Sequence, residues 1–413
     1  MKRTLISCLL SAFIAVPFYG GCDKDKDKTT KAEEKKTEEK ADEEERTETE
    51  KVEKDEPAPL PKVELHKEIS DAIHKAASDC DLTQSTFTFK CEEYKNAGKV
   101  YQKTGQSEPA KAIETISVMF TDEDPNISNI ASRFLSSYTS SFMASQASKQ
   151  PDFIDKATGE RLLAGMKKLA ESEKEEDKIR ARQIVEQVTH AATLAGLMDE
   201  VVEIYKEVKD VHVKRRILEN IMRYGRMAGF PVVKQAVEGD DANMKAAGLR
   251  ATLNMPRWTD EEREVLCPFG AEYLSDENIQ AATHAAGIVV RCKHEEGYVD
   301  KLLEEGRRRV KEGQWEGDYV FPYRDVCFRG FFGKDKIPPE ETCEKVYNFL
   351  EWVANQNNVD PTMRGRALGM IYYQRRDAKT HKLLRKYRRH KVKEVQQAAL
   401  EAMKSLEETY LKK

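Results

Sequence analysis

The sequence predicts an all-helical chain built from repeated helix pairs. Two observations lead to this prediction. Charged residues make up 34% of the 413 positions and aromatic residues only 8%, which suits helices with solvated faces. From about residue 107 onward, a short motif that is typical of a helix start recurs at similar intervals. β-Sandwiches and barrels need β-branched runs and frequent turns, which this composition does not provide.

The first 22 residues indicate an export signal, so they are excluded from the predicted fold. Two basic residues follow the initiator methionine, and the apolar stretch from Leu5 to Phe18 is too short to span a bilayer comfortably. Gly20 and Gly21 then precede Cys22. This arrangement resembles the lipobox of bacterial lipoproteins, which implies cleavage before Cys22 and a lipid on that residue. A plain secretory signal that is cut nearby is the alternative.

Residues 23–61 are predicted to form a disordered charged linker. From Asp23 to Glu56 there are 16 acidic and 10 basic side chains and almost no apolar ones. Such a segment cannot bury enough apolar surface to offset the entropy of ordering its backbone. Three prolines, the last of them Pro61, end the segment. Its expected role is to hold the folded part away from a membrane.

Six cysteines remain after Cys8 and Cys22 are set aside. An even number in an exported chain indicates disulfides, although the sequence alone cannot fix their connectivity. The spacing favours neighbours as partners, namely Cys80 with Cys91, Cys267 with Cys292 and Cys327 with Cys343. A zinc site is the alternative, but the chain has no CxxC pair and no Cys/His cluster with ligand spacing.

Residues 62–105 are predicted to form a small helical hairpin that caps the repeats. Its apolar residues at helical spacing are Val63, Ile69, Ile73 and Ala76 in one helix, and Tyr94, Val100 and Tyr101 in the other. A bridge between Cys80 and Cys91 would close the loop between the helices. It would stabilise the hairpin by about 2–3 kcal/mol, at an end where a terminal repeat lacks one neighbour.

Residues 106–413 carry the repeated motif. Each copy has an acidic or N-capping residue, an apolar residue three positions later, and a basic or polar residue next. The copies begin at Asp124, Glu176, Asp210, Asp241, Asp276 and Asp360, and a last copy without the acid begins at Val392. From Ile179 the apolar anchors recur after 34, 31 and 35 residues, and the gap of 84 to Met363 fits two longer units.

This pattern resembles the second helix of HEAT repeats, whose motif runs Asp-x-x-Val-Arg-x-x-Ala-x-x-Ala-Leu. The resemblance implies an α-solenoid of helical hairpins over residues 106–413. The motif also suits a helix start, since Asp caps free backbone amides, and Pro125 and Pro361 stand where a first turn tolerates proline. Thr259 and Glu262 have the spacing of a capping box. A bundle of irregular helix pairs is the alternative, which the regular spacing disfavours.

No arrangement of residues indicates catalysis. The sequence lacks HExxH, GxSxG, P-loop and Rossmann motifs, and its eight histidines are scattered. His190 and His284 fall within predicted helices, where packing is the commoner role. We therefore expect a non-catalytic protein without a cofactor or metal, and an enzyme is only the third-ranked alternative.

One short segment is unusually aromatic and is a candidate binding surface. Its candidate binding residues are Trp315, Tyr319, Phe321, Tyr323, Phe331 and Phe332, and Phe328 lies among them. Aromatic side chains are common in interface hot spots because they bury large areas at low entropic cost. The alternative is structural, with these rings filling a broadened repeat.

A second candidate surface is basic. Its residues are Arg375, Arg376, Lys382, Arg385, Lys386, Arg388 and Arg389. We expect a helix near 377–389 and another at 392–411, with Leu383, Leu384 and Tyr387 in the core. The arginines and lysines would then point outward as an anion site for lipid head groups, lipopolysaccharide or an acidic protein. A solvated face is the alternative, and nucleic acid is an unlikely partner of an exported protein.

These features predict a lipid-anchored scaffold of the bacterial cell envelope, facing the periplasm or the cell surface. It is expected to bind a protein partner through the helical-repeat surface. The alternative function is direct binding of anionic envelope components through the C-terminal basic residues.

Overall fold

The computed structural model describes residues 61–82, 90–137, 140–150, 152–327 and 338–408. Within these residues the structure is all-α, with 19 α-helices and no strand. The export signal predicted for residues 1–22 lies outside the described residues, as does the linker up to residue 60.

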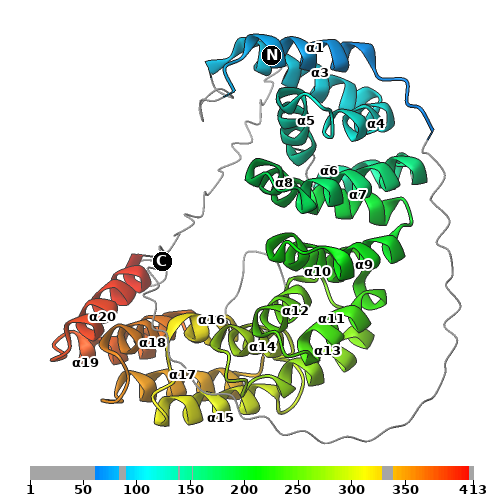
Figure 1. The fold of residues 1–413 in the computed structure, drawn as a ribbon. Coiled ribbons are helices and arrows are strands. Elements are labelled where there is room, and N and C mark those ends of the chain that lie inside the picture. Colours follow the sequence, from blue (N-terminus) through cyan, green and yellow to red (C-terminus); the bar gives the residue numbers. More distant parts are fainter. Residues whose placement is uncertain (1–60, 83–89, 138–139, 151, 328–337, 409–413) are drawn as a thin grey trace, which may run out of the picture. The chain divides into compact units, whose positions relative to one another are not determined.

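The helices follow one another along the chain (Figure 1). They are α1 (Lys67–Asp79), α3 (Glu92–Ser107), α4 (Pro109–Met119), α5 (Pro125–Ser137), α6 (Ser140–Lys149), α7 (Lys156–Glu171), α8 (Glu175–Leu194), α9 (Met198–Glu207), α10 (Val211–Gly225), α11 (Phe230–Glu238), α12 (Ala242–Asn254), α13 (Asp260–Glu272), α14 (Ile279–Arg291), α15 (Tyr298–Lys311), α16 (Phe321–Asp325), α17 (Glu340–Ala354), α18 (Pro361–Gln374), α19 (Ala378–Tyr387) and α20 (Lys393–Leu406). Two 3₁₀ turns, η1 (Arg226–Ala228) and η2 (Gly317–Val320), interrupt the series.

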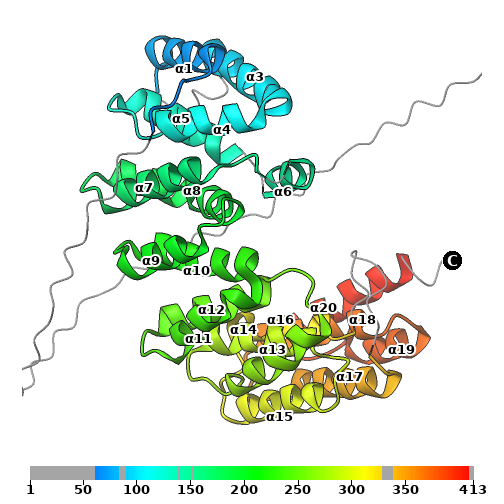
Figure 2. The ribbon, with the colours of Figure 1, turned by 90° about the vertical axis from the view of Figure 1, so that its right-hand side faces the viewer.

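Successive helices pack against each other in pairs, and each pair contacts the neighbouring pairs. Contacts join α7 to α8, α9 to α10, α11 to α12, α13 to α14, α17 to α18 and α19 to α20. The second helices of these pairs also contact one another in order, from α8 through α10, α12 and α14, then through α16 to α18 and α20 (Figures 1 and 2). The chain therefore places its motif-bearing helices in one continuous row.

The apolar anchors of the motif form much of the core between the pairs. Val213 and Val395 are fully buried, and Met244 and Met363 are nearly so. Ile179 differs, because 44% of its surface is exposed. Helix α8 begins at Glu175, four residues before Ile179, so the first turn extends beyond the packed part of the helix and Ala181 is the first buried apolar residue.

The helix starts use the caps that the motif provides. The side chains of Asp210, Asp241 and Asp360 each accept a hydrogen bond from a backbone N–H in the first turn of their helix. Thr259 and Glu262 form the predicted capping box. The expectation for α14 was wrong by two residues.

In α14 the cap is Asn278, whose side chain accepts from the N–H groups of Gln280 and Ala281. Asp276 lies before the helix and accepts from the N–H of Asn278 and from the ammonium of Lys245. Asp276 therefore orients the capping residue Asn278 and also links α14 to α12 through Lys245.

The three cysteine pairs that the spacing favours lie at disulfide distance. The S–S distances are 2.04 Å for Cys80–Cys91, 1.94 Å for Cys267–Cys292 and 2.13 Å for Cys327–Cys343. Disulfides persist in oxidising compartments, so these pairs indicate an extracytoplasmic setting. Among the helices that the structure describes, none has the length and apolarity to cross a bilayer.

Glycine allows two helices of the last repeats to approach closely. A Cβ at Gly365 of α18 would lie 2.8 Å from the backbone oxygen of Glu394 in α20. Because that neighbour is backbone, it could not move aside without shifting the whole helix. Gly365 therefore sets the spacing between α18 and α20.

Candidate functional site

The aromatic segment divides into a buried part and an exposed part. Trp315, Tyr319 and Tyr323 are buried, and their rings contact one another and Phe349 of α17. These three side chains fill the space between η2, α16 and α17, which is the structural role given as the alternative to partner binding. Phe331 and Phe332, with Phe328, lie outside the described residues.

Charged groups close to this aromatic core are paired. Arg309, which is 2% exposed, forms an ion pair with Glu305 at 2.8 Å and donates to the backbone oxygens of Leu274 and Asp276. Burial raises the pKa of Tyr319 to about 12, so its hydroxyl stays protonated and acts only as a hydrogen-bonding group. This region has the pairing that a buried structural network requires.

Phe321 is the exposed member of the aromatic segment, and it lines a groove. The groove has a volume of about 500 Å³ and lies between α16, α18 and α20. Its wall includes Phe321 and Arg324 of α16, Tyr372 and Tyr373 of α18, and Glu394 and Glu401 of α20.

The groove is open at Gly369, which is one of its lining residues. A Cβ at Gly369, in the middle of α18, would have no heavy atom within 4 Å. Glycine inside a helix is less favourable than alanine by about 1 kcal/mol, so an open site there is not explained by helix stability. Arg366, one turn earlier, is exposed and lies with its guanidinium 5.7 Å from the ring centre of Phe321.

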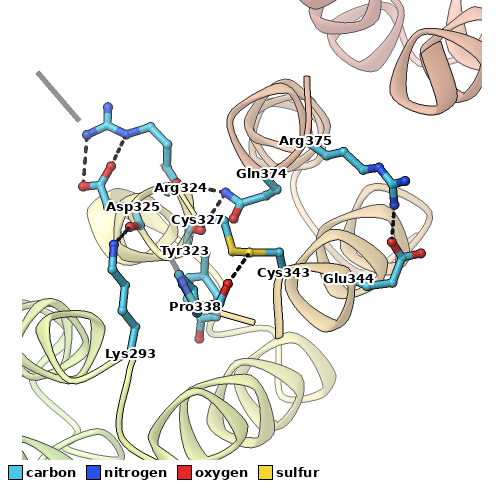
Figure 3. The surroundings of a disulfide bond; sticks show 10 residues. All are labelled: Lys293, Tyr323, Arg324, Asp325, Cys327, Pro338, Cys343, Glu344, Gln374 and Arg375. Carbon is cyan, nitrogen blue, oxygen red and sulfur yellow. Dashed lines mark hydrogen bonds and ion pairs between the residues drawn. A yellow bond between two sulfur atoms is a disulfide. The ribbon is translucent and has the colours of Figure 1, made fainter. Parts of the chain in front are cut away.

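Covalent and polar contacts hold α16 in place beside the groove (Figure 3). The disulfide Cys327–Cys343 ties the chain just after α16 to α17. Gln374, at the end of α18, donates two hydrogen bonds of 2.9 Å to the backbone oxygens of Tyr323 and Arg324. The short helix that carries Phe321 is therefore fixed from two sides.

The basic surface predicted near the C-terminus is partly present. Helices α19 and α20 bury Leu383, Leu384 and Tyr387 as expected. On the opposite side, Lys382, Arg385, Lys386, Arg388 and Arg389 are exposed and form no ion pair with any described residue. These five residues are called the α19 basic surface below.

Arg375 and Arg376 do not belong to this surface. Arg375 forms an ion pair with Glu344 at 2.7 Å and another with Asp377, so it joins α17 to the start of α19. The guanidinium of Arg376 lies 5.0 Å from the ring centre of Tyr372. Both side chains are half-buried, and their contacts serve the packing of the last repeats.

The described residues offer no arrangement of acids, bases or metal ligands that indicates catalysis. No group of three or more His, Cys, Asp or Glu side chains among them could hold a metal ion. The pKa of His190 is lowered to about 4 by burial and then by the charge of Arg223. Its ring stacks on Tyr224 with the centres 4.0 Å apart, which is a packing role.

Sequence reasoning missed the residues of α18 that complete the groove. Tyr372, Tyr373, Arg366 and Gly369 all fall in one motif copy, where their types suit an ordinary repeat helix. A tyrosine pair beside a mid-helix glycine was the one local sign that this helix differs from the others.

Comparisons with known proteins find no match, either among protein-family models or among curated proteins.

Proposed function

We propose that the chain is a lipid-anchored envelope protein whose HEAT-like α-solenoid binds a segment of a protein partner. The observation that carries this proposal is the groove between α16, α18 and α20. It combines an exposed aromatic ring, an open glycine floor and a rigid wall.

The walls of the groove suggest the chemistry of the partner segment. Arg366 on α18 and Glu394 on α20 are both exposed and carry opposite charges. An apolar side chain of the partner would pack on Phe321 and Tyr373, with an acidic group toward Arg366 and a basic group toward Glu394. Aromatic anchors within a polar rim are typical of binding hot spots.

The row of motif-bearing helices and the three cysteine pairs support the other parts of the proposal. Helix pairs that contact only their neighbours are the arrangement expected of a repeat array. The cysteine pairs indicate export, and Gly20 and Gly21 before Cys22 resemble a lipoprotein cleavage site. Cys22→Ala should leave the protein unprocessed or release it from membranes, as fractionation and intact mass would show. Unchanged membrane association and mass would contradict lipidation.

Filling the groove tests its role without altering its polar walls. Gly369→Leu should block the partner, because the added side chain would occupy the open floor. Gly369→Ala is the matched control, since it also favours the helix but adds only one methyl group. Crosslinking pull-downs from native membranes should recover a protein with wild type and Gly369→Ala and lose it with Gly369→Leu. Equal recovery with all three would reject the groove as the binding site.

A second candidate function is binding of anionic envelope components by the α19 basic surface. It is favoured by five exposed cations without ion pairs to the described residues. Basic groups attract an anionic membrane by about 1 kcal/mol each. Changing Lys382, Arg385 and Lys386 to Glu should abolish binding to anionic liposomes at low salt. Equal binding by wild type and variant would leave these residues as a solvated face.

A further inference from the structure

A second cavity, distant in sequence from the groove, has four arginines among its six lining residues. It has a volume of about 340 Å³ and lies where α8, α10 and α12 follow one another (Figure 1). Its lining residues are Arg182, His212, Arg215, Arg216, Glu219 and Arg250. Neither of the proposed binding surfaces includes them.

The four arginines and one carboxylate of the lining leave three positive charges in excess, and two once Arg182 is counted with its partner Asp210. Glu219, the lone carboxylate of the lining, is 9% exposed. It lies 3.4 Å from Nη1 of Arg216 and 3.4 Å from Nε of Arg250, so it bridges two of the four guanidinium groups. Arg182 is paired outside the lining, with Asp210 at 2.7 Å.

Arg215 has no such partner. It is half-buried, and it forms no hydrogen bond or ion pair with any described residue. A guanidinium remains charged at any physiological pH, so it cannot respond to burial by losing its proton. Charge that is partly removed from water without a counter-ion is unfavourable. A bound anion would supply the counter-charge that Arg215 lacks among the described residues.

A nearby histidine responds to the same excess of positive charge. The pKa of His284 on α14 is lowered to about 4, first by burial and then by the charges of Arg250 and Arg215. His284 is consequently neutral at pH 7 and adds no further positive charge. Asp318 acts in the opposite direction on this pKa and does not line the cavity.

We propose that this cavity binds a phosphate group, either as free phosphate or as a phosphate monoester of a larger molecule such as a lipid. Planar guanidinium groups donate paired hydrogen bonds that match the oxygens of phosphate. Glu219 supplies one carboxylate, which Arg216 and Arg250 share, so Arg215 has no counter-ion among the described residues. A phosphate dianion matches both the excess charge and the several donors of Arg215, Arg216 and Arg250.

Two substitutions test this site in opposite directions. Arg215→Gln removes the unpaired guanidinium and should weaken phosphate binding roughly tenfold or more, as for loss of a charged hydrogen bond. Glu219→Gln removes the internal competitor and should strengthen binding by a factor of roughly three or more. Loss of a merely structural contact would not produce this gain. Arg385→Gln on α19 makes the same change in net charge away from the cavity and should alter affinity less than about twofold.

Calorimetry with inorganic phosphate, and flotation with phosphatidylcholine vesicles that contain phosphatidic acid, would be performed on the full chain carrying Cys22→Ala, so that the proposed lipid does not itself attach the protein to vesicles. Saturable binding of inorganic phosphate that depends on Arg215 would support a free phosphate or a soluble monoester. Binding to the vesicles alone, again dependent on Arg215, would support a lipid phosphate.

Absence of saturable binding to both probes would overturn the proposal. Equal weakening by Arg215→Gln and Arg385→Gln would also overturn it, since binding would then follow net charge alone. If Arg215→Gln fails to fold, Glu219→Gln decides the question, because unchanged or weaker binding by that variant contradicts the site. The result is independent of the Gly369 experiment, which concerns a different cavity.

Discussion

The region around α15 and the surface of α19 are both rich in arginine, yet they use it differently. Arg309 is almost fully buried and is surrounded by Glu305 and two backbone oxygens. On α19 the exposed cations have water around them and no described carboxylate beside them. The comparison shows that burial, rather than residue type, decides whether an arginine stabilises this fold or remains available to a ligand.

The largest loss of stability is expected from the buried network. Arg309→Ala would remove one of the two arginines that pair with Glu305 and would leave the backbone oxygens of Leu274 and Asp276 without this donor. It should lower the free energy of unfolding by about 3–5 kcal/mol. Urea denaturation followed by circular dichroism would measure it. Arg388→Ala on α19 is the control and should change stability by less than about 0.5 kcal/mol. If both variants lose similar free energy of unfolding, burial does not distinguish Arg309 from the exposed arginines.

Burial of His190 should make the stability of the fold depend on pH. The folded-state pKa of His190 is about 4, below the ordinary value of 6.5, so the folded protein resists protonating this ring. Its contribution is present above pH 6.5 and is lost as the pH falls from there toward 4. The full loss would be up to about 3 kcal/mol. Between pH 6.5 and 4, the midpoint of thermal unfolding should therefore fall less in His190→Gln than in wild type. If the midpoints of the two proteins fall by the same amount, His190 does not cause this loss of stability.

A neutral buried group should have an intermediate effect. Gln374→Ala would leave the backbone oxygens of Tyr323 and Arg324 without their donor and should destabilise the protein by about 1–3 kcal/mol. It should also loosen α16 and reduce capture of the groove's partner in the pull-down. Unchanged stability together with unchanged capture would show that the disulfide alone fixes α16.

Arg375 lies between the two extremes. It is half-buried and paired with Glu344 and Asp377, so Arg375→Gln should lower stability by about 1 kcal/mol. Anionic liposome binding should be nearly unaffected, because this side chain is already occupied. If Arg375→Gln weakens liposome binding more than it lowers the free energy of unfolding, Arg375 contributes to the α19 basic surface after all.

The smallest stability effect is expected on α19 itself. Changing Lys382, Arg385 and Lys386 to Glu should alter the free energy of unfolding by less than about 1 kcal/mol in total, most of it from helix-dipole effects. Loss of liposome binding with an unchanged melting temperature would show that these exposed cations serve binding, whereas the buried Arg309 serves stability. A large drop in melting temperature would instead show that these cations stabilise the fold.

The features that could be predicted from the sequence are those that depend on neighbours along the chain. Asp360 caps α18 through N–H groups two and three residues away, and Leu383, Leu384 and Tyr387 follow helical periodicity. Arg364, the basic residue of its motif copy, donates a hydrogen bond to the backbone oxygen of Ala354 at the end of α17.

What could not be predicted depends on contacts between helix pairs. Tyr319, Phe321 and Tyr323 fall within one short irregular segment, where no periodicity tells the buried rings from the exposed one. Arg375 meets Glu344 only because α17 and α18 pack together. The arginine cavity gathers side chains from three successive motif copies, so no single copy contains its pattern.

The order of the cysteines has a consequence for biogenesis. The bridges join residues separated by 11, 25 and 16 positions, and each connects a cysteine to the next of the six along the chain. An exported chain enters an oxidising compartment with its N-terminus first. When the second cysteine of each pair emerges, only one of the earlier cysteines of the series is still unpaired, and that cysteine is its native partner. Oxidation in order of emergence then gives the native connectivity directly. Maturation of this protein should therefore require an oxidant but no isomerase to reshuffle its bonds.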